Sequence, residues 1–212
     1  MSEPAARADR VEPLLAGVLH WSVHDERIDF RSDAYAVDSA CGRVLIDPLP
    51  LTEAALASLG DVEAICVTGA FHQRAAWTLR ERLQVPVHAP SGGVNLVQPA
   101  DESYGDDALL PGGLRALRRP GPTGPHYVLL WERDGARTLF IADLLMRADD
   151  EPLRFVPDEH QDDPRLTRKS VRELLDLKAD HLCPAHGRPV VGGAAQALRV
   201  ALLLDASEPA SS

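Results

Sequence analysis

The pattern of apolar and polar residues is most regular between Val62 and Pro90, where its period changes twice. Val62 to Thr68 is short, β-branched and apolar, which is typical of a strand buried on both faces. From Ala75 to Leu83 apolar residues recur at the helical period, and Val85 to Ala89 returns to a strand pattern. The segment predicts a βαβ unit. Open α/β sheets bind ligands beyond the carboxyl ends of their strands, so the loop 69–74 is where chemistry is expected.

The rest of the chain predicts more strands and helices of the same kind. An Asp134-Gly135 pair favours a tight hairpin, and Asp163 before Pro164 is a typical start of a helix. Two stretches, 91–113 and 149–163, show no steady period and are expected to be mostly loop. Predicted strands are Val18–Val23, Ile28–Phe30, Ala34–Asp38, Val44–Asp47, Gly113–Arg118, Tyr127–Glu132, Thr138–Asp143 and His181–Pro184, and predicted helices are Glu53–Leu59, 164–178 and Ala194–Leu204.

Composition limits the number of domains and the kind of partner. At 212 residues and 45% apolar content we expect one domain, 14–206, with flexible termini at 1–13 and 207–212. The net charge of -10 argues against nucleic acid or an anionic membrane as the main partner, so a small ligand is expected. An anionic ligand would need a local basic pocket. No apolar run approaches a membrane span, and an odd set of three cysteines favours a reducing cytoplasm.

A strand that ends at Thr68, a loop that contains His72 and an amphipathic helix after it are found in this order. This arrangement resembles the metal-binding loop of the metallo-beta-lactamase superfamily, whose usual form is T-H-x-H-x-D-H. Read from Thr68, the four usual ligand positions hold Gly69, Phe71, Gln73 and Arg74, and His72 falls between them. Other stretches resemble the family in order and spacing. They are RVLIDP ending near Asp47, TLFIAD ending at Asp143, PAHG carrying His186, and a glycine-rich run with Pro122 in place of a histidine and His126 four residues on.

The resemblance implies an α/β fold, an αββα sandwich of two mixed β-sheets flanked by helices. It also implies zinc or iron and hydrolysis of an ester, amide, thioester or phosphodiester bond. Of the matched ligands, Asp143 and His186 remain, and His72 could complete a set for one zinc or iron ion with an open position for water. The resulting hypothesis is a metal-dependent hydrolase of a small ester or thioester. Asp143 and Arg74 would be catalytic, and Arg74 and His126 would bind an anionic substrate.

The same residues also support a metal-free interpretation. Arg74 stands at the loop's last ligand position, so its guanidinium could replace the cation and pair bidentately with Asp143. The protein would then be a non-catalytic pseudoenzyme, or a module that binds an anionic ligand without a cofactor. A lone loop histidine such as His72 is more often hydrogen-bonded than a ligand, and Asp47 is expected to accept from loop amides. Both hypotheses place His72, Asp143 and His186 at three strand ends of one sheet.

Overall fold

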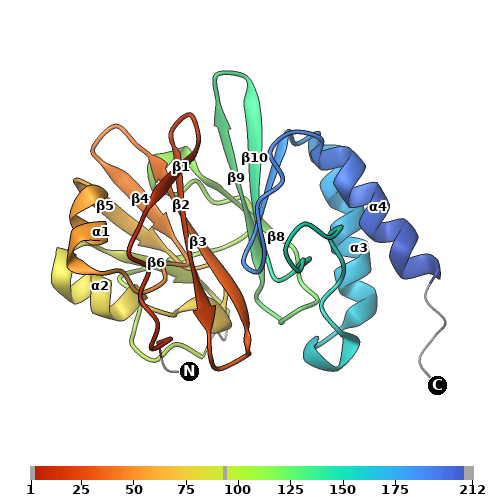
Figure 1. The fold of residues 1–212 in the computed structure, drawn as a ribbon, viewed down its shortest axis with the longest axis horizontal. Coiled ribbons are helices and arrows are strands. Elements are labelled where there is room, and N and C mark those ends of the chain that lie inside the picture. Colours follow the sequence, from red (N-terminus) through yellow and green to blue (C-terminus); the bar gives the residue numbers. More distant parts are fainter. Residues whose placement is uncertain (1–2, 93–94, 208–212) are drawn as a thin grey trace.

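The computed structural model describes residues 3–92 and 95–207, which form two β-sheets packed face to face (Figure 1). The first sheet has seven strands in chain order, and the second has four in the order β11-β10-β9-β8. The strands of the first sheet are β1 (Glu12–Leu15), β2 (Val18–Asp25), β3 (Phe30–Asp38), β4 (Arg43–Ile46), β5 (Val62–Cys66), β6 (Val87–Pro90) and β7 (Glu102–Tyr104). Those of the second are β8 (Arg115–Arg118), β9 (Tyr127–Arg133), β10 (Ala136–Ala142) and β11 (His181–Pro184).

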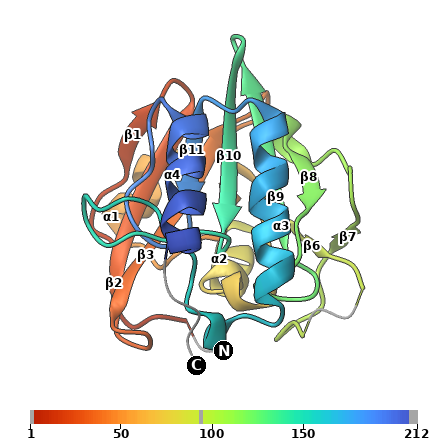
Figure 2. The same ribbon diagram turned by 90° about the vertical axis from the view of Figure 1, so that its right-hand side faces the viewer.

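Helices cover the outer face of each sheet. On the first sheet lie α1 (Glu53–Ser58) and α2 (Ala76–Leu83), and on the second lie α3 (Pro164–Leu174) and α4 (Ala194–Ser207), which Figure 2 shows side by side in front of the strands. Local signals set the ends of these helices. The Thr52 side chain accepts from Ala55 at the start of α1, and Asp163 accepts from Leu166 at the start of α3. The predicted αββα sandwich is confirmed.

Three buried clusters follow from this layering. One lies between the first sheet and its helices, and another lies between the second sheet and α3 with α4. The third joins the inner faces of the sheets and includes Tyr35, Ile46, Leu129 and Phe140. Alternate residues of each strand therefore pack in different clusters, as the period of a β-strand requires.

Strands β2 and β3 form one long hairpin with a register from Val18 opposite Val37 to Asp25 opposite Phe30. The sequence predicted two separate strands at 28–30 and 34–38, because the polar residues Ser32 and Asp33 interrupt the apolar pattern. Both of these residues are buried and hydrogen-bonded, so they continue the strand. β3 pairs with β2 on one side and with β4 on the other, so it lies inside the sheet.

The first residues are part of the fold from Ala8 onward. Ala8 N donates to Pro50 O at 2.9 Å, and Thr52 N donates to Ala8 O at 2.9 Å. Strand β1 begins at Glu12, so the predicted domain boundary at residue 14 falls inside a strand. Residues 1–2 and 208–212 of the predicted flexible termini lie outside the described residues. Among the described helices, none has the length and apolarity that a bilayer crossing requires.

The parallel strands of the two sheets set the position of the loops. β4 and β5 run parallel in the first sheet, and β10 and β11 run parallel in the second. The carboxyl end of each of these strands carries a polar residue, namely Asp47, Thr68, Asp143 and His186. The contacts described below show that these ends meet where the two sheets adjoin.

Candidate metal centre

Three potential metal ligands from distant parts of the chain converge at the junction of the sheets. His72 ends a short 3-10 turn, η1 (Ala70–His72), after β5, whereas Asp143 follows β10 and His186 follows β11. One ligand atom from each lies within 4.8 Å of the other two. The predicted convergence is therefore present, but the expectation of a single sheet is wrong, because β5 belongs to the first sheet and β10 and β11 to the second.

The orientation of the His72 ring is fixed by Thr68 and Asp47. Thr68 Oγ1 donates its only proton to Asp47 Oδ2 at 2.6 Å, so it can only accept from His72 Nδ1, which lies 2.8 Å away. The Asp47 carboxylate also accepts from Thr68 N at 2.7 Å and lies 3.2 Å from His72 Nδ1. Nδ1 therefore carries hydrogen, and Nε2 points toward Asp143 at 3.1 Å.

His186 is held in the same way by the backbone of β3. Its Nδ1 lies 2.9 Å from the carbonyl oxygen of Arg31, which can only accept, so this nitrogen also carries hydrogen. Ser32 Oγ lies 3.4 Å from the same nitrogen. Nε2 of His186 then faces Asp143 Oδ1 at 3.3 Å. Both imidazoles thus present the same nitrogen to one carboxylate, one from each side.

This arrangement demands a cation. In the described part of the chain, His72 Nε2 and Asp143 Oδ1 are buried without a hydrogen-bond partner. Buried polar atoms are rarely left unpaired. Two ring nitrogens with lone pairs beside a carboxylate would repel it unless a proton or a metal ion lies between them. The donor set, two imidazoles and a carboxylate, is the chemistry that zinc and iron accept, so the residues fit a metal ion.

The charges in the cluster shift its protonation in the absence of metal. Burial disfavours a charged His72, but the negative charges of Asp143 and Asp47 outweigh burial and raise the pKa of His72 to about 9. Burial also disfavours a charged Asp143, yet the positive charge of a protonated His72 holds the pKa of this carboxyl well below its ordinary value. Without metal, a proton on His72 supplies the cation.

Comparison with known proteins agrees with this fold. A family model described as "Metallo-beta-lactamase superfamily" matches residues 15–183. The chain belongs to the metallo-beta-lactamase superfamily. A search of curated proteins finds no match.

Solved metallo-beta-lactamase structures share the fold over nearly the whole chain. The DIM-1 metallo-beta-lactamase is 15% identical with a TM-score of 0.74, over 95% of this chain and 98% of that one. A metallo-beta-lactamase from Erythrobacter litoralis is 18% identical with a TM-score of 0.70, over 96% and 95%. An archaeal superfamily protein from Sulfolobus tokodaii is 16% identical with a TM-score of 0.69, over 91% and 88%. At these identities the likeness concerns the fold.

Arg74 does not form the predicted pair with Asp143. Its guanidinium is buried and donates to three backbone carbonyls, those of Asp33 at 2.7 Å, Asp47 at 3.2 Å and Ala185 at 3.3 Å. Within the described residues no ion pair or hydrogen bond joins it to Asp143. At the superfamily's last loop-ligand position this chain therefore has a side chain that joins β3 to the loops after β4 and β11.

His126 lies behind Asp143. Its Nδ1 is 2.9 Å from the carbonyl oxygen of Arg119, so Nε2 accepts from the backbone N of Asp143 at 3.3 Å. Burial, the largest influence, lowers the pKa of His126 to about 4, so the ring is neutral. Both nitrogens are engaged, and the predicted substrate-binding residue instead fixes the backbone that carries Asp143.

Three contributors to the site had no clear signal in the sequence. Asp47 was expected to accept from loop amides, which the bond from Thr68 N confirms, but its link to His72 was not expected. The hydroxyl of Thr68 and the carbonyl of Arg31 also orient the histidines. A backbone carbonyl can never be found from residue type. Asp47 has a positive φ of 46°, and an Asp-Pro pair at a strand end does not predict this conformation.

Proposed function

We propose that the protein is a metal-dependent hydrolase that uses one zinc or iron ion, held by His72, Asp143 and His186, on a small anionic ester or thioester. The observation that supports it is the shared orientation of the two imidazoles. Each donates through Nδ1 to a fixed acceptor and turns Nε2 toward Asp143. Ligating histidines in metal sites are oriented by such partners, and zinc is the first candidate for two nitrogens and an oxygen.

A bound ion would supply Lewis acidity, which polarises a carbonyl group and makes water more acidic at neutral pH. The protein's own residues would set the protonation of the site and orient the ligands. Asp143 stays ionised because its pKa is well below the ordinary value, so at neutral pH it accepts and does not donate protons. Asp47 with Thr68 orients His72, and the Arg31 carbonyl orients His186.

The surroundings of the two histidines favour a substrate with an apolar acyl part. Phe71, the residue before His72, is 49% exposed, and the ring of Phe30 lies 6.3 Å from that of His186. Aromatic side chains near the two histidines would suit the apolar portion of an ester or thioester. We expect a small molecule and not nucleic acid as partner. Free cysteines at Cys41, Cys66 and Cys183 suit the cytoplasm, which we propose as its location.

A second candidate is a metal-free module that binds an anionic ligand without hydrolysing it. The observation that favours it is the raised pKa of His72, because a proton on this ring already satisfies the two carboxylates on either side. In this case the imidazolium of His72, and not the guanidinium of Arg74, takes the place of the cation. The four usual loop ligands, replaced here by Gly69, Phe71, Gln73 and Arg74, agree with such a loss.

Metal analysis of protein purified without chelator separates the two candidates. The hydrolase predicts zinc or iron near stoichiometric amounts in the wild type and a loss of it in His186→Ala and Asp143→Ala. His24→Ala is the matched control, because this exposed histidine pairs with Asp29 on the surface. Turnover of simple ester and thioester substrates should follow metal content across the set. Equal and negligible metal in all four proteins would reject the hydrolase and leave the module.

A further inference from the structure

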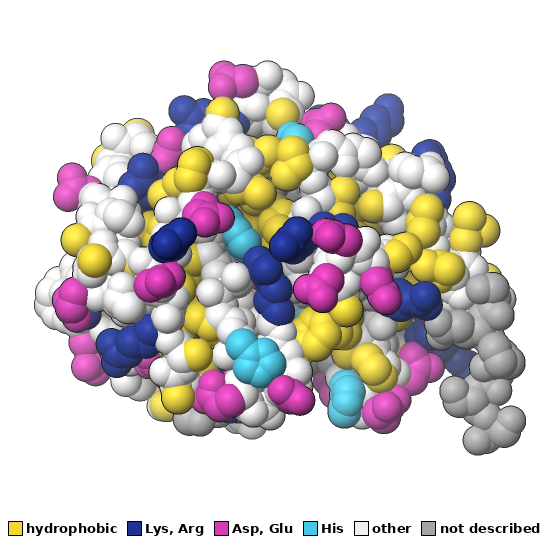
Figure 3. All heavy atoms as spheres, viewed as in Figure 1, with side chains coloured by type: hydrophobic (Ala, Val, Ile, Leu, Met, Phe, Trp, Pro, Cys, Tyr) yellow, Lys and Arg dark blue, Asp and Glu magenta, His cyan; other side chains and the backbone are white. Residues whose placement is uncertain are grey.

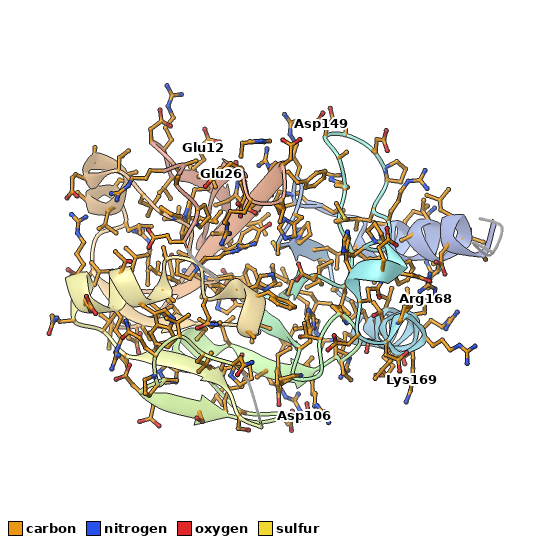
Figure 4. The ribbon with its side chains drawn as sticks, turned by 90° about the horizontal axis from the view of Figure 1, so that it is seen from below. Glu12, Glu26, Asp106, Asp149, Arg168 and Lys169 are labelled. Atoms are coloured by element: carbon orange, nitrogen blue, oxygen red, sulfur yellow. The ribbon has the colours of Figure 1, made fainter. Side chains whose placement is uncertain are left out.

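A polar cavity lies near the metal cluster, between the edge of the first sheet and the loops of the second. It has a volume of about 580 Å³ and is lined by residues that include Arg10, His20, Arg31, Arg147 and Arg188. In Figure 4 the labelled Asp149 of the loop after β10 lies along the same side of the molecule as Glu12 and Glu26 of the first sheet. Figure 3 shows basic side chains gathered between the two halves on the front face.

Arg147 is the unusual member of this group. Its Nη2 donates to Pro189 O at 3.1 Å, but its Nε is buried without a partner in the described part of the chain. Arg31 pairs with Asp33 at 2.8 Å and Arg188 pairs with Asp150 at 3.2 Å, whereas no carboxylate of the described residues pairs with Arg147. A partly buried guanidinium with a free buried donor is a place for an oxyanion.

The field at Arg147 also favours an anion. Arg31 and Arg188 line the same cavity as Arg147, so three positive charges repel one another there. An added negative charge would relieve this repulsion. The acidic side chains on the cavity wall do not fill that role, because Asp150 already pairs with Arg188 and Asp9 and Glu12 are exposed. In a protein with a net charge of -10, a cavity with four arginines is a local exception.

We infer that this cavity binds a small molecule through a phosphate or carboxylate group, with Arg147 as the main donor and Arg31 and Arg188 beside it. A guanidinium presents paired N–H donors that match the oxygens of either group. The site is distinct from the metal cluster, since His72, Asp143 and His186 are not among the residues that line the cavity. The two are neighbours, because the Arg31 carbonyl holds His186 and the Gly187 amide donates to Asp33, the partner of Arg31.

The test measures binding of inorganic phosphate to the full chain by calorimetry, with acetate as the carboxylate probe, each with and without EDTA. We expect saturable binding of at least one probe that survives EDTA, since the site does not need the metal. Arg147→Gln should weaken it about 10- to 100-fold, as expected for loss of a charge-assisted hydrogen bond. Arg188→Gln, an exposed position, should weaken it several-fold with little risk to folding.

Arg115→Gln is the control, because this exposed arginine of β8 pairs with Asp107 and does not line the cavity. Its affinity should equal that of the wild type. The inference is overturned if neither probe saturates, if Arg115→Gln weakens binding as much as Arg147→Gln, or if binding disappears in EDTA or in His186→Ala and is unchanged in Arg147→Gln. That last result would place the anion on the metal, so failure here leaves the hydrolase proposal standing.

Discussion

His72 lies between two carboxylates, 3.2 Å from Asp47 and 3.1 Å from Asp143, in an almost fully buried position. A neutral ring would leave the negative charges uncompensated, so the site holds either a proton or a metal ion. These two cations compete for the same nitrogen. The residue thus links the metal content of the protein to its protonation.

We predict that the metal-free protein is most stable near pH 6.5. A raised pKa stabilises the folded state below the unfolded value of 6.5, so the contribution of His72 is lost as pH rises from 6.5 to about 9. The lowered pKa of His126 acts in the opposite direction, because the unfolded ring binds a proton that the folded ring excludes as pH falls from 6.5 to about 4. Each effect is on the order of 3 kcal/mol. Urea unfolding in the presence of EDTA at several pH values measures the free energy of unfolding across this range.

The variant His72→Gln assigns the alkaline part of this profile. It should remove the fall in stability between pH 6.5 and 9 while leaving the acidic part in place. His24→Gln, at the exposed surface pair with Asp29, should reproduce the wild-type profile. A wild-type stability that stays flat from pH 6.5 to 9 would contradict the charged state of His72.

Asp47→Asn should weaken zinc binding about 10- to 100-fold, the usual cost of removing a carboxylate behind a ligating histidine. Asparagine keeps an acceptor for Thr68 N but removes the charge beside His72 Nδ1. Competition with a zinc-sensitive chelating dye gives the affinity. Asp61→Asn, an exposed change close to β5, is the control and should have no effect. Equal affinities would show that Asp47 serves only the fold.

At the scale of elements, the turn after β11 depends on a single glycine. Gly187 has a φ of +100°, and a Cβ added there would lie 2.1 Å from the carbonyl oxygen of Arg147. Its amide also donates to Asp33 Oδ2 at 2.8 Å. The turn therefore sets how closely the loop after β11 approaches the loop after β10, and with it the position of His186.

Gly187→Ala should destabilise the protein by roughly 2–4 kcal/mol, because strain at this φ adds to a clash with backbone. Chemical denaturation gives the free energy of unfolding, and metal content should fall with it as His186 shifts. Gly124→Ala is the control, since nothing lies within 4 Å of an added Cβ there. If Gly187→Ala unfolds at the same denaturant concentration as the wild type, the loop packing described here is incorrect.

Most of the elements could be predicted from the sequence because their apolar periods are strong. The βαβ unit from β5 to β6 and the β9–β10 hairpin at Asp134-Gly135 are found where the pattern indicates them. The continuity of β3 through Ser32 and Asp33 could not be predicted, because these polar residues are buried to support the site. The ligand group could be predicted, because its residue types and its places at strand ends are visible in the sequence. The direction of the Arg74 side chain could not be predicted, because backbone carbonyls set it.

At the scale of the whole molecule, Arg74 joins the two halves of the sandwich. From the start of α2 it donates to carbonyls of β3 and of the residue after β4 in the first sheet, and to Ala185 after β11 in the second. A planar guanidinium spreads five donors over three nitrogens and so reaches three separated acceptors, whereas a lysine offers its three donors from a single nitrogen.

Arg74→Met should therefore cost about 3 kcal/mol of stability by removing three hydrogen bonds to buried carbonyls, and Arg74→Lys should recover only part of it. Thermal and urea unfolding measure the loss. Arg82→Met is the control, because this half-exposed arginine of α2 pairs with Glu53 on the surface and should change stability by less than about 0.5 kcal/mol. If Arg74→Met instead keeps full stability and loses only substrate affinity, the predicted substrate contact is right and the structural role is wrong.

The imidazole of His72 comes from the first sheet, and the carboxylate of Asp143 and the imidazole of His186 come from the second. Any ion that binds all three would therefore also hold the two sheets together. Its occupancy would slow amide hydrogen exchange in β5 and in β10 and β11 together. Metal binding and separation of the two sheets would then be one coupled equilibrium. Loss of the ion would make the protein more susceptible to proteolysis where the sheets meet.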